Sequence, residues 1–170
     1  MKNLFLENLN NYPKIYRNNC IDIYDLSECV PGTVYLNWKG FNKVSEKILT
    51  QALDRSSEYI QSRNIKVFIS DFSRLNAISR DVMDWMCDNW NKEVQRKGLV
   101  GEITLNQSEN ETIEREINNF LERRDMEDII NIRAENLHSA VNMAQKIFQN
   151  TEKPEPQSIR NLSQGEQAMR

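Results

Sequence analysis

The sequence predicts an α/β domain in which helices pack on a mostly parallel sheet. Three observations predict this class: short runs of β-branched residues alternate with apolar residues at helical spacing, turn residues separate the runs, and 39% of the 170 residues are hydrophobic. A chain of this length corresponds to one domain of ordinary size. The formal net charge of -3, with no cluster of Lys and Arg, argues against binding to nucleic acid.

A β-hairpin and a long helix are the first elements that the pattern predicts. Apolar residues alternate from Ile21 onward and again through residues 34–38, and Pro31 and Gly32 between the two runs are typical of a turn. Apolar residues then recur at the helical period as far as Asn64, which predicts an amphipathic helix. We expect the hairpin to supply an antiparallel edge of the sheet.

Three further pairs of strand and helix follow. Residues 65–70 form a nearly continuous apolar run rich in β-branched residues, which is typical of a central strand covered on both faces. Ser79 is the expected N-cap of the next helix, Gly98 ends that helix, and Gly101 indicates a bulge or a close approach in the strand after it. The later elements are that strand at 99–105, a helix with an apolar stripe from Ile113 to Leu121, a strand at 129–132, and a helix from Leu137 to about 150.

The predicted order is therefore ββαβαβαβα, with right-handed crossovers between parallel strands. Residues 1–19 are expected to form a short arm that packs on the body, residues 20–150 the α/β domain, and residues 151–170 a polar tail. The fold class, rather than any single motif, is what this pattern predicts most directly.

The compartment is predicted by what the chain lacks. No apolar run reaches the ~20 residues that span a bilayer, and Asn and Glu interrupt the apolar start before it can form a signal-peptide core. The three cysteines form no C-x-x-C pair, which favours reduced thiols over disulfides or a zinc site. We therefore expect a cytoplasmic protein that holds no metal.

Several of these features together resemble one family. The run Val34–Gly40 ahead of a long helix, the strand end Ile69–Asp71, and a helix from Ser79 that contains Trp85 and Trp90 resemble the small bacterial STAS-like proteins. These SpoIIAA-like proteins are related to anti-sigma-factor antagonists and to the cytoplasmic domains of sulfate transporters. The resemblance covers almost all of the predicted domain. It implies the order ββαβαβαβα, no catalytic chemistry and a role as a regulatory, protein-interaction or ligand-sensing module.

The resemblance also implies the place of a modification site. In the best-understood members, a partner kinase phosphorylates a Ser or Thr beside the strand-final Asp, in a turn that opens the second helix. The matching stretch is 71–79, in which Ser73 and Ser79 are the only hydroxyls, so these two are the implied phosphoacceptors. The loop here is longer and lacks the glycine of that turn, so only the location is carried over.

The candidate contacts for a partner or ligand lie around the same strand end. Asp71 occupies the carboxyl end of a central strand, where open α/β sheets bind ligands, although it could instead bond its own loop through Ser73. Trp85 and Trp90 lie about 140° apart around their helix, so both cannot face the core, and packing of an indole in the core is the alternative to surface contact. We expect contacts from Asp71, Ser73, Ser79, Trp38, Trp85 and Trp90. Trp90→Ala is then expected to abolish capture without unfolding the chain.

Catalytic chemistry has little support in these residues. The only histidine, His138, has no nucleophile on a glycine-rich elbow, and the five glycines form neither a P-loop nor a GxGxxG. We therefore expect no enzyme activity and no cofactor. An enzyme that uses Asp71 as a general base is the remaining catalytic reading.

Two other functions stay open. The chain could carry or sense a small apolar molecule or lipid between the sheet and helices, by analogy with a related lipid-transfer fold. The residues named for that site are Met83, Trp85, Met86 and Phe120. Self-association is the other possibility, because an exposed edge strand invites pairing.

Acidic side chains suggest docking faces or solvated surfaces. Asp81, Asp84 and Asp88 share one helix face, and eight acidic residues against three arginines lie between Glu109 and Asp128. A basic partner surface would suit either group.

Overall fold

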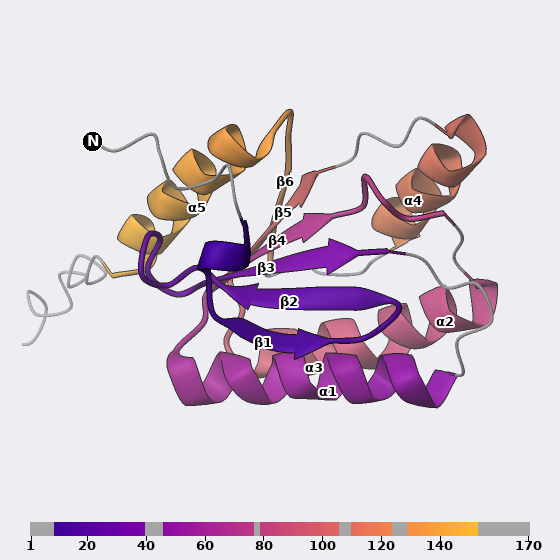
Figure 1. Cartoon of the computed structure of the whole chain (residues 1–170), viewed down its shortest axis with the longest axis horizontal. Helices are drawn as coiled ribbons and strands as arrows, with labels where there is room; N and C mark the ends of the chain where they lie inside the picture. The colour runs from indigo at the N-terminus through magenta and orange to yellow at the C-terminus, as the bar shows by residue number, and fades with distance from the viewer. Residues whose placement is uncertain (1–8, 40–45, 77–78, 106–109, 124–128, 153–170) are drawn as a thin grey trace, which may run out of the picture.

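The hydrophobic runs assemble into one six-stranded sheet with the order β1-β2-β3-β4-β5-β6 (Figure 1). Each strand lies beside the strands that precede and follow it in the chain. The structure, a computed structural model, describes residues 9–39, 46–76, 79–105, 110–123 and 129–152. The predicted tail lies outside the described residues except for its first two positions, and so do residues 1–8 of the predicted arm.

The first three strands are antiparallel: β1 (Lys14–Arg17), β2 (Ile21–Asp25) and β3 (Thr33–Trp38). The predicted hairpin of β2 and β3 is confirmed. Its turn requires Gly32, which has a φ of +63° and where a Cβ would lie 2.7 Å from the ring of Phe148. Strand β1 was not predicted, and because it pairs outside β2, the hairpin is not the edge of the sheet.

The other three strands are parallel to one another and to β3: β4 (Val67–Asp71), β5 (Gly101–Leu105) and β6 (Ile130–Ala134). Strand β4 lies between β3 and β5 with its first four residues buried, which confirms the predicted central strand. The pairing is regular through Gly101, so there is no bulge. A Cβ there would lie 3.0 Å from Ile147 Cδ1, so the glycine permits a close approach of the last helix.

Helices cover both faces of the sheet. In chain order, the helical segments are a short 3-10 turn η1 (Leu9–Asn11), α1 (Glu46–Arg63), α2 (Arg80–Trp85), the π-helical turn η2 (Met86–Trp90), α3 (Asn91–Arg96), α4 (Glu111–Arg123) and α5 (Leu137–Thr151). Segments α2, η2 and α3 run on without a break, so one predicted helix contains a π-helical turn. In Figure 1, α1, α2 and α3 lie together below the sheet, and α5 lies on the opposite side.

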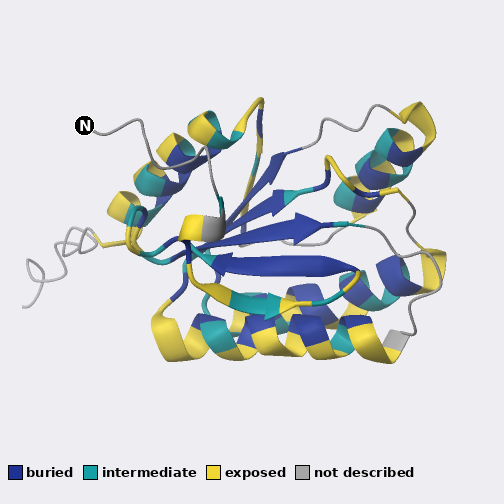
Figure 2. Ribbon diagram, in the orientation of Figure 1, coloured by how far each residue is buried: buried dark blue, intermediate teal, exposed yellow. Residues whose placement is uncertain are grey.

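The alternation of side chains along the strands gives each face its own core. Figure 2 shows β2 and β3 coloured as buried along nearly all of their length. One cluster joins α1, the α2–α3 helix and α4 to a face made by Ile21, Ile23, Val34, Leu36, Trp38 and Phe68. The other joins α5 to a face made by Tyr24, Tyr35, Val67, Ile69, Ile103 and Leu105. Burial on both sides explains why residues 65–70, which include most of β4, form a nearly continuous apolar run.

The predicted class is confirmed: an α/β domain with a mostly parallel sheet and helices packed on it. The observed chain of elements starts with the additional strand β1, which falls within the segment predicted to be an arm. From β2 onward, β2 and β3 come first and helices then alternate with strands to the end of α5.

A partly buried hydrogen bond ties α1 to the end of β2, beside the start of β3. The hydroxyl of Tyr59 donates to Asp25 Oδ2 at 2.6 Å, and the backbone N–H of Ser27 donates to Asp25 Oδ1 at 2.8 Å. Burial opposes ionisation of this carboxyl, but the hydrogen bonds from Ser27 and Tyr59 and the charge of Arg63 outweigh it, so the pKa of Asp25 lies below its ordinary value.

Tyr59→Phe should lower the free energy of unfolding by about 1 kcal/mol at pH 7. Because the folded-state pKa of Asp25 is below the unfolded value of ~3.9, its stabilisation is complete above that value and is lost as the pH falls through the folded pKa. The deficit of the variant should therefore shrink as urea unfolding is repeated from pH 7 toward pH 3. Tyr16→Phe is the matched control, and a deficit that stays constant across this range would contradict the assignment.

Candidate functional site

Asp71 ends β4 at the carboxyl edge of the parallel strands. Its Oδ2 accepts a hydrogen bond from the hydroxyl of Tyr35 on β3. Its Oδ1 accepts the backbone N–H of Ser73 at 2.8 Å. Both carboxylate oxygens thus accept hydrogen bonds from within the chain, and the bond from Ser73 holds the start of the following loop.

Tyr35 is the buried partner in this pair. Burial and the neighbouring charge of Asp71 raise the pKa of Tyr35 far above its ordinary value, so the phenol keeps its proton and remains the donor at neutral pH. The bond joins the middle of β3 to the end of β4 through side chains, in addition to the backbone ladder that pairs Asn37 with Asp71. The position of Asp71 is therefore fixed from within the sheet.

Two further polar residues continue the row of Asp71 across the sheet. Register pairs Asp71 with Asn37 on β3, and Asn37 in turn with Asp22 on β2. Asp22 is 5% exposed, and its Oδ1 lies 2.7 Å from Lys39 Nζ and 3.7 Å from Arg17 Nε. Sequence reasoning missed these residues, although polar side chains inside otherwise apolar strands were the available signal.

The loop after β4 is held to the core by two apolar side chains. Phe72 and Leu75 are buried, and the ring of Phe72 stacks on Trp38 with centroids 5.7 Å apart. The N–H of Phe72 also donates to the carbonyl of Leu105, at 2.9 Å. Between these anchors, Ser73 and Arg74 are exposed. The loop therefore presents polar side chains from a fixed backbone.

Ser79 is exposed at the start of α2, in an extended conformation with φ of -74° and ψ of 137°. It occupies the predicted N-cap position, but its side chain makes no capping hydrogen bond. Both implied phosphoacceptors, Ser73 and Ser79, are thus exposed residues. Residues 77–78 of the same stretch lie outside the described residues.

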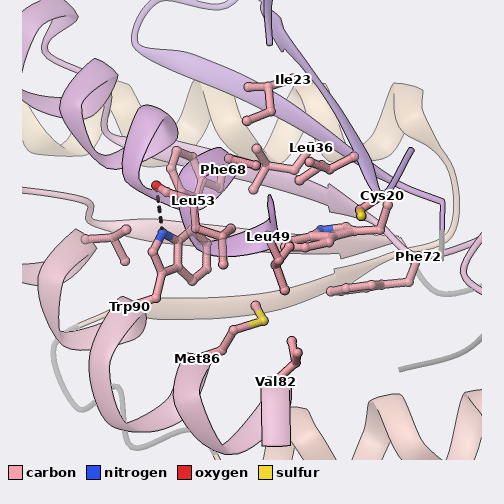
Figure 3. Packing of buried hydrophobic residues seen from close by; sticks show 14 of the residues in the cluster. Cys20, Ile23, Leu36, Leu49, Leu53, Phe68, Phe72, Val82, Met86 and Trp90 are labelled. Carbon is pink, nitrogen blue, oxygen red and sulfur yellow. Dashed lines mark hydrogen bonds between the residues drawn. The ribbon is translucent and has the colours of Figure 1, made fainter. Parts of the chain in front are cut away.

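The three tryptophans differ in how far their side chains are buried. Trp38 is 1% exposed and Trp90 is 2% exposed, so neither presents its ring to a docking partner. The Trp90 indole donates to the carbonyl of Leu53 at 3.2 Å and stacks on Phe68, within the cluster drawn in Figure 3. The expectation that Trp38 and Trp90 contact a partner is therefore corrected, because both side chains pack in the core.

Trp85 is the tryptophan that reaches the surface. It is half-buried at the end of α2, directly before the π-helical turn that carries Trp90 inward. The prediction that the two helix tryptophans cannot both face the core is therefore confirmed. Trp85 lies six residues after Ser79, on the helix that begins at the end of the loop.

Of the acidic stripe formed by Asp81 and Asp84 on α2 and Asp88 on η2, one carboxylate is paired within the chain. Asp84 Oδ1 accepts from Arg123 at 2.6 Å, which links α2 to the end of α4. Asp81 and Asp88 are exposed. Two of the three carboxylates thus remain available to a basic surface, whereas the acidic segment 109–128 lies partly outside the described residues.

The residues named for an apolar ligand all contribute to one packed cluster. Met83, Met86 and Phe120 are buried between the sheet and its helices, and Trp85 packs against them from the rim. Figure 3 shows Met86 directed toward Leu49, among the same side chains as Trp90.

Comparison with known proteins adds no relative: no protein-family model matches the chain, and no curated protein matches it. Among the described helices, none is both long and apolar enough to cross a membrane. Within the same part of the chain, no three His, Cys, Asp or Glu side chains are grouped as metal ligands.

Proposed function

We propose that this protein is a non-enzymatic regulatory module of the STAS-like kind, and that it binds a protein partner through the loop after β4 and the start of α2. The docking surface comprises Ser73, Arg74, Asn76, Ser79, Arg80 and Trp85. Five of these residues are exposed and Trp85 is half-buried. The succession of elements from β2 onward supports the STAS-like assignment, since it matches the order that the resemblance implies.

The observation that carries the proposal is the anchoring of residues 72–75, at the start of the loop, on the core. Asp71 holds its first turn, and Phe72 and Leu75 bury the apolar side chains on either side of the exposed Arg74. A loop ordered in the free protein loses little conformational entropy on binding, which favours recognition. A half-buried tryptophan beside it offers the type of side chain that anchors many interfaces.

A regulatory phosphate fits the same surface. Phosphorylation of Ser79 would place negative charge at the start of the helix, where the helix dipole favours it. Phosphorylation of Ser73 would place that charge beside the ionisable Asp71 and would weaken docking of an acidic partner. Either modification would alter the docking surface without disturbing the core.

Arg74→Glu should abolish capture of the partner while leaving the free energy of unfolding within about 0.5 kcal/mol of wild type, because the side chain is exposed. Photo-crosslinkers at position 76 of the loop and at position 51 on the exposed side of α1 test this in the cells that make the protein. A specific crosslinked protein is expected from position 76 alone, and it should disappear in an Arg74→Glu or a Trp85→Ala background.

Arg55→Glu on α1 is the matched control for the charge change, since Arg55 is likewise exposed. Equal crosslinking from both positions, or capture that survives both Arg74→Glu and Trp85→Ala, would contradict the proposed surface.

A further inference from the structure

One asparagine side chain lies wholly inside the protein without a hydrogen bond. Asn91 is 0% exposed at the start of α3, and neither its Oδ1 nor its Nδ2 has a partner within the part of the chain that the structure describes. An amide that leaves water without replacing its hydrogen bonds costs free energy, so buried amides are paired with protein groups or with ordered water. The side chain of Asn91 therefore points to a bound molecule.

The π-helical turn η2 directs this side chain inward. The backbone N–H of Asn91 donates to the carbonyl of Met86, five residues earlier. In an unbroken α-helix, five residues would place Asn91 about 140° around the axis from Met86. The additional residue in a π turn reduces that angle, and both side chains are buried. Such turns occur frequently at functional sites, and this one brings a polar side chain into the core.

The flank of α3 that carries Asn91 faces away from α1. Trp90 Nε1 donates to the carbonyl of Leu53 on α1 at 3.2 Å. Lys97 Nζ donates to Ser57 Oγ, also on α1, at 3.1 Å. Seven residues are about two turns of a helix, so these two contacts lie on one side of it. Asn91 is about 100° from Trp90 and still buried, so the helical period directs it toward the sheet on the side of β5, the strand into which α3 leads.

The sheet carries buried polar side chains at this place. Trp90 stacks on Phe68 of β4, and the register places Phe68 opposite Glu102 of β5. Ser70 Oγ donates to Glu102 Oε1 at 2.6 Å. Because alternate residues of a strand share a face, Ser70 and Thr104 lie on the same face as Phe68 and Glu102. Ser70, Glu102 and Thr104 are between 0% and 3% exposed, so they form a polar group inside an apolar cluster.

We propose that Asn91 binds internal water between α3 and β5. The water accepts a hydrogen bond from Asn91 Nδ2 and donates to Asn91 Oδ1, and its remaining hydrogen bonds are made with the Ser70–Glu102 pair. An internal water molecule typically makes about three hydrogen bonds to buried polar groups, which this arrangement supplies. Globular proteins hold about one such water per 27 residues, so several are ordinary in a chain of 170.

The enclosure of the site favours water over a larger ligand. Asn91 and Ser70 are both 0% exposed, so the occupant is surrounded by protein. Water needs only a space of about its own size and two to four polar partners. Bridged in this way, α3 is held to the sheet by hydrogen bonds as well as by the packing of Trp90. The site lies in the core and is separate from the docking surface after β4, so neither proposal depends on the other.

Asn91→Leu in the full chain tests the proposal by the sign of its effect. Leucine has nearly the shape of asparagine but no polar atoms. If water links Asn91 to the sheet, the variant removes two of its hydrogen bonds, and the equilibrium constant for folding should fall about tenfold in urea unfolding at pH 7. An amide without any partner would give the opposite result, because its loss would raise that constant. Lys92→Leu, at the exposed next position, is the control and should change the constant by no more than about twofold.

Nuclear magnetic resonance of the wild type gives a second test that does not require any variant to fold. The side-chain amide protons of Asn91 should show Overhauser contacts with a long-lived water molecule. The side chain of Asn89, an exposed residue, is the internal control and should show only rapidly exchanging solvent. No long-lived water at Asn91, a small organic molecule in its place, or an Asn91→Leu variant more stable than wild type would overturn the proposal.

Discussion

Trp90→Ala should lower the free energy of unfolding by about 3–5 kcal/mol, a large share of the 5–15 kcal/mol that stabilises a typical domain. The indole is 2% exposed, stacks on Phe68 with centroids 5.9 Å apart and donates to the carbonyl of Leu53. Its removal leaves a cavity between α1 and the sheet and takes one of two side-chain donors from the Leu53 carbonyl, which keeps the hydroxyl of Ser56 at 2.7 Å. Urea unfolding followed by far-ultraviolet circular dichroism measures the loss.

Trp85→Ala is the matched comparison, because the same residue type is half-buried one π-helical turn earlier. We expect it to cost about 1 kcal/mol. Trp90→Phe separates the two contributions of Trp90, since the phenyl ring keeps part of the packing but cannot donate to Leu53. Equal losses for Trp85→Ala and Trp90→Ala would contradict the assignment of Trp90 to the core.

Lys39→Met should cost about 3 kcal/mol at neutral pH, because it leaves the Asp22 carboxylate buried without its nearest cation. Asp22 is 5% exposed, and Lys39 Nζ lies 2.7 Å from its Oδ1. Arg17 is 3.7 Å away and its side chain is 67% exposed, so it screens the carboxylate only in part. Thermal or urea unfolding at pH 7 reports the change.

A double variant distinguishes the ion pair from general damage to β3. Lys39→Met combined with Asp22→Asn removes both charges, so most of the loss should be recovered relative to Lys39→Met alone. Lys47→Met, at an exposed position of α1, controls for loss of a lysine and should change the free energy of unfolding by less than about 0.5 kcal/mol. If the losses in the free energy of unfolding of the two single variants simply add in the double variant, the ion pair is not the cause of the loss.

Most of the elements could be predicted because their hydrophobic period is unambiguous. Residues 65–70 read as a strand covered on both faces, and α5 shows apolar residues at helical spacing along its whole length. Strand β1 was missed because it has only four residues, two of them exposed and charged, and follows a proline. Such an edge strand carries no periodic signal, and its pairing with β2 exists only in the tertiary structure.

The sequence predicted where the candidate site lies better than it predicted which residues form it. A strand-final aspartate marks the carboxyl edge of a sheet, and Asp71 with Ser73 is found there in direct contact. The partners Tyr35 and Asn37 come from a neighbouring strand whose register no local pattern specifies. The sequence showed that Trp85 and Trp90 differ in direction, but the π-helical turn that contains Trp90 leaves no reliable signature in the sequence.

Native mass spectrometry of the full chain, isolated gently from its own cells, tests the central claim most directly. The account predicts a complex with one defined protein partner for the wild type and for Arg55→Glu, and its absence for Arg74→Glu. A phosphate on Ser73 or Ser79 in the same spectra would further support a regulatory role. A chain that carries a non-covalent small molecule and no protein, or a partner retained by Arg74→Glu, would contradict the account.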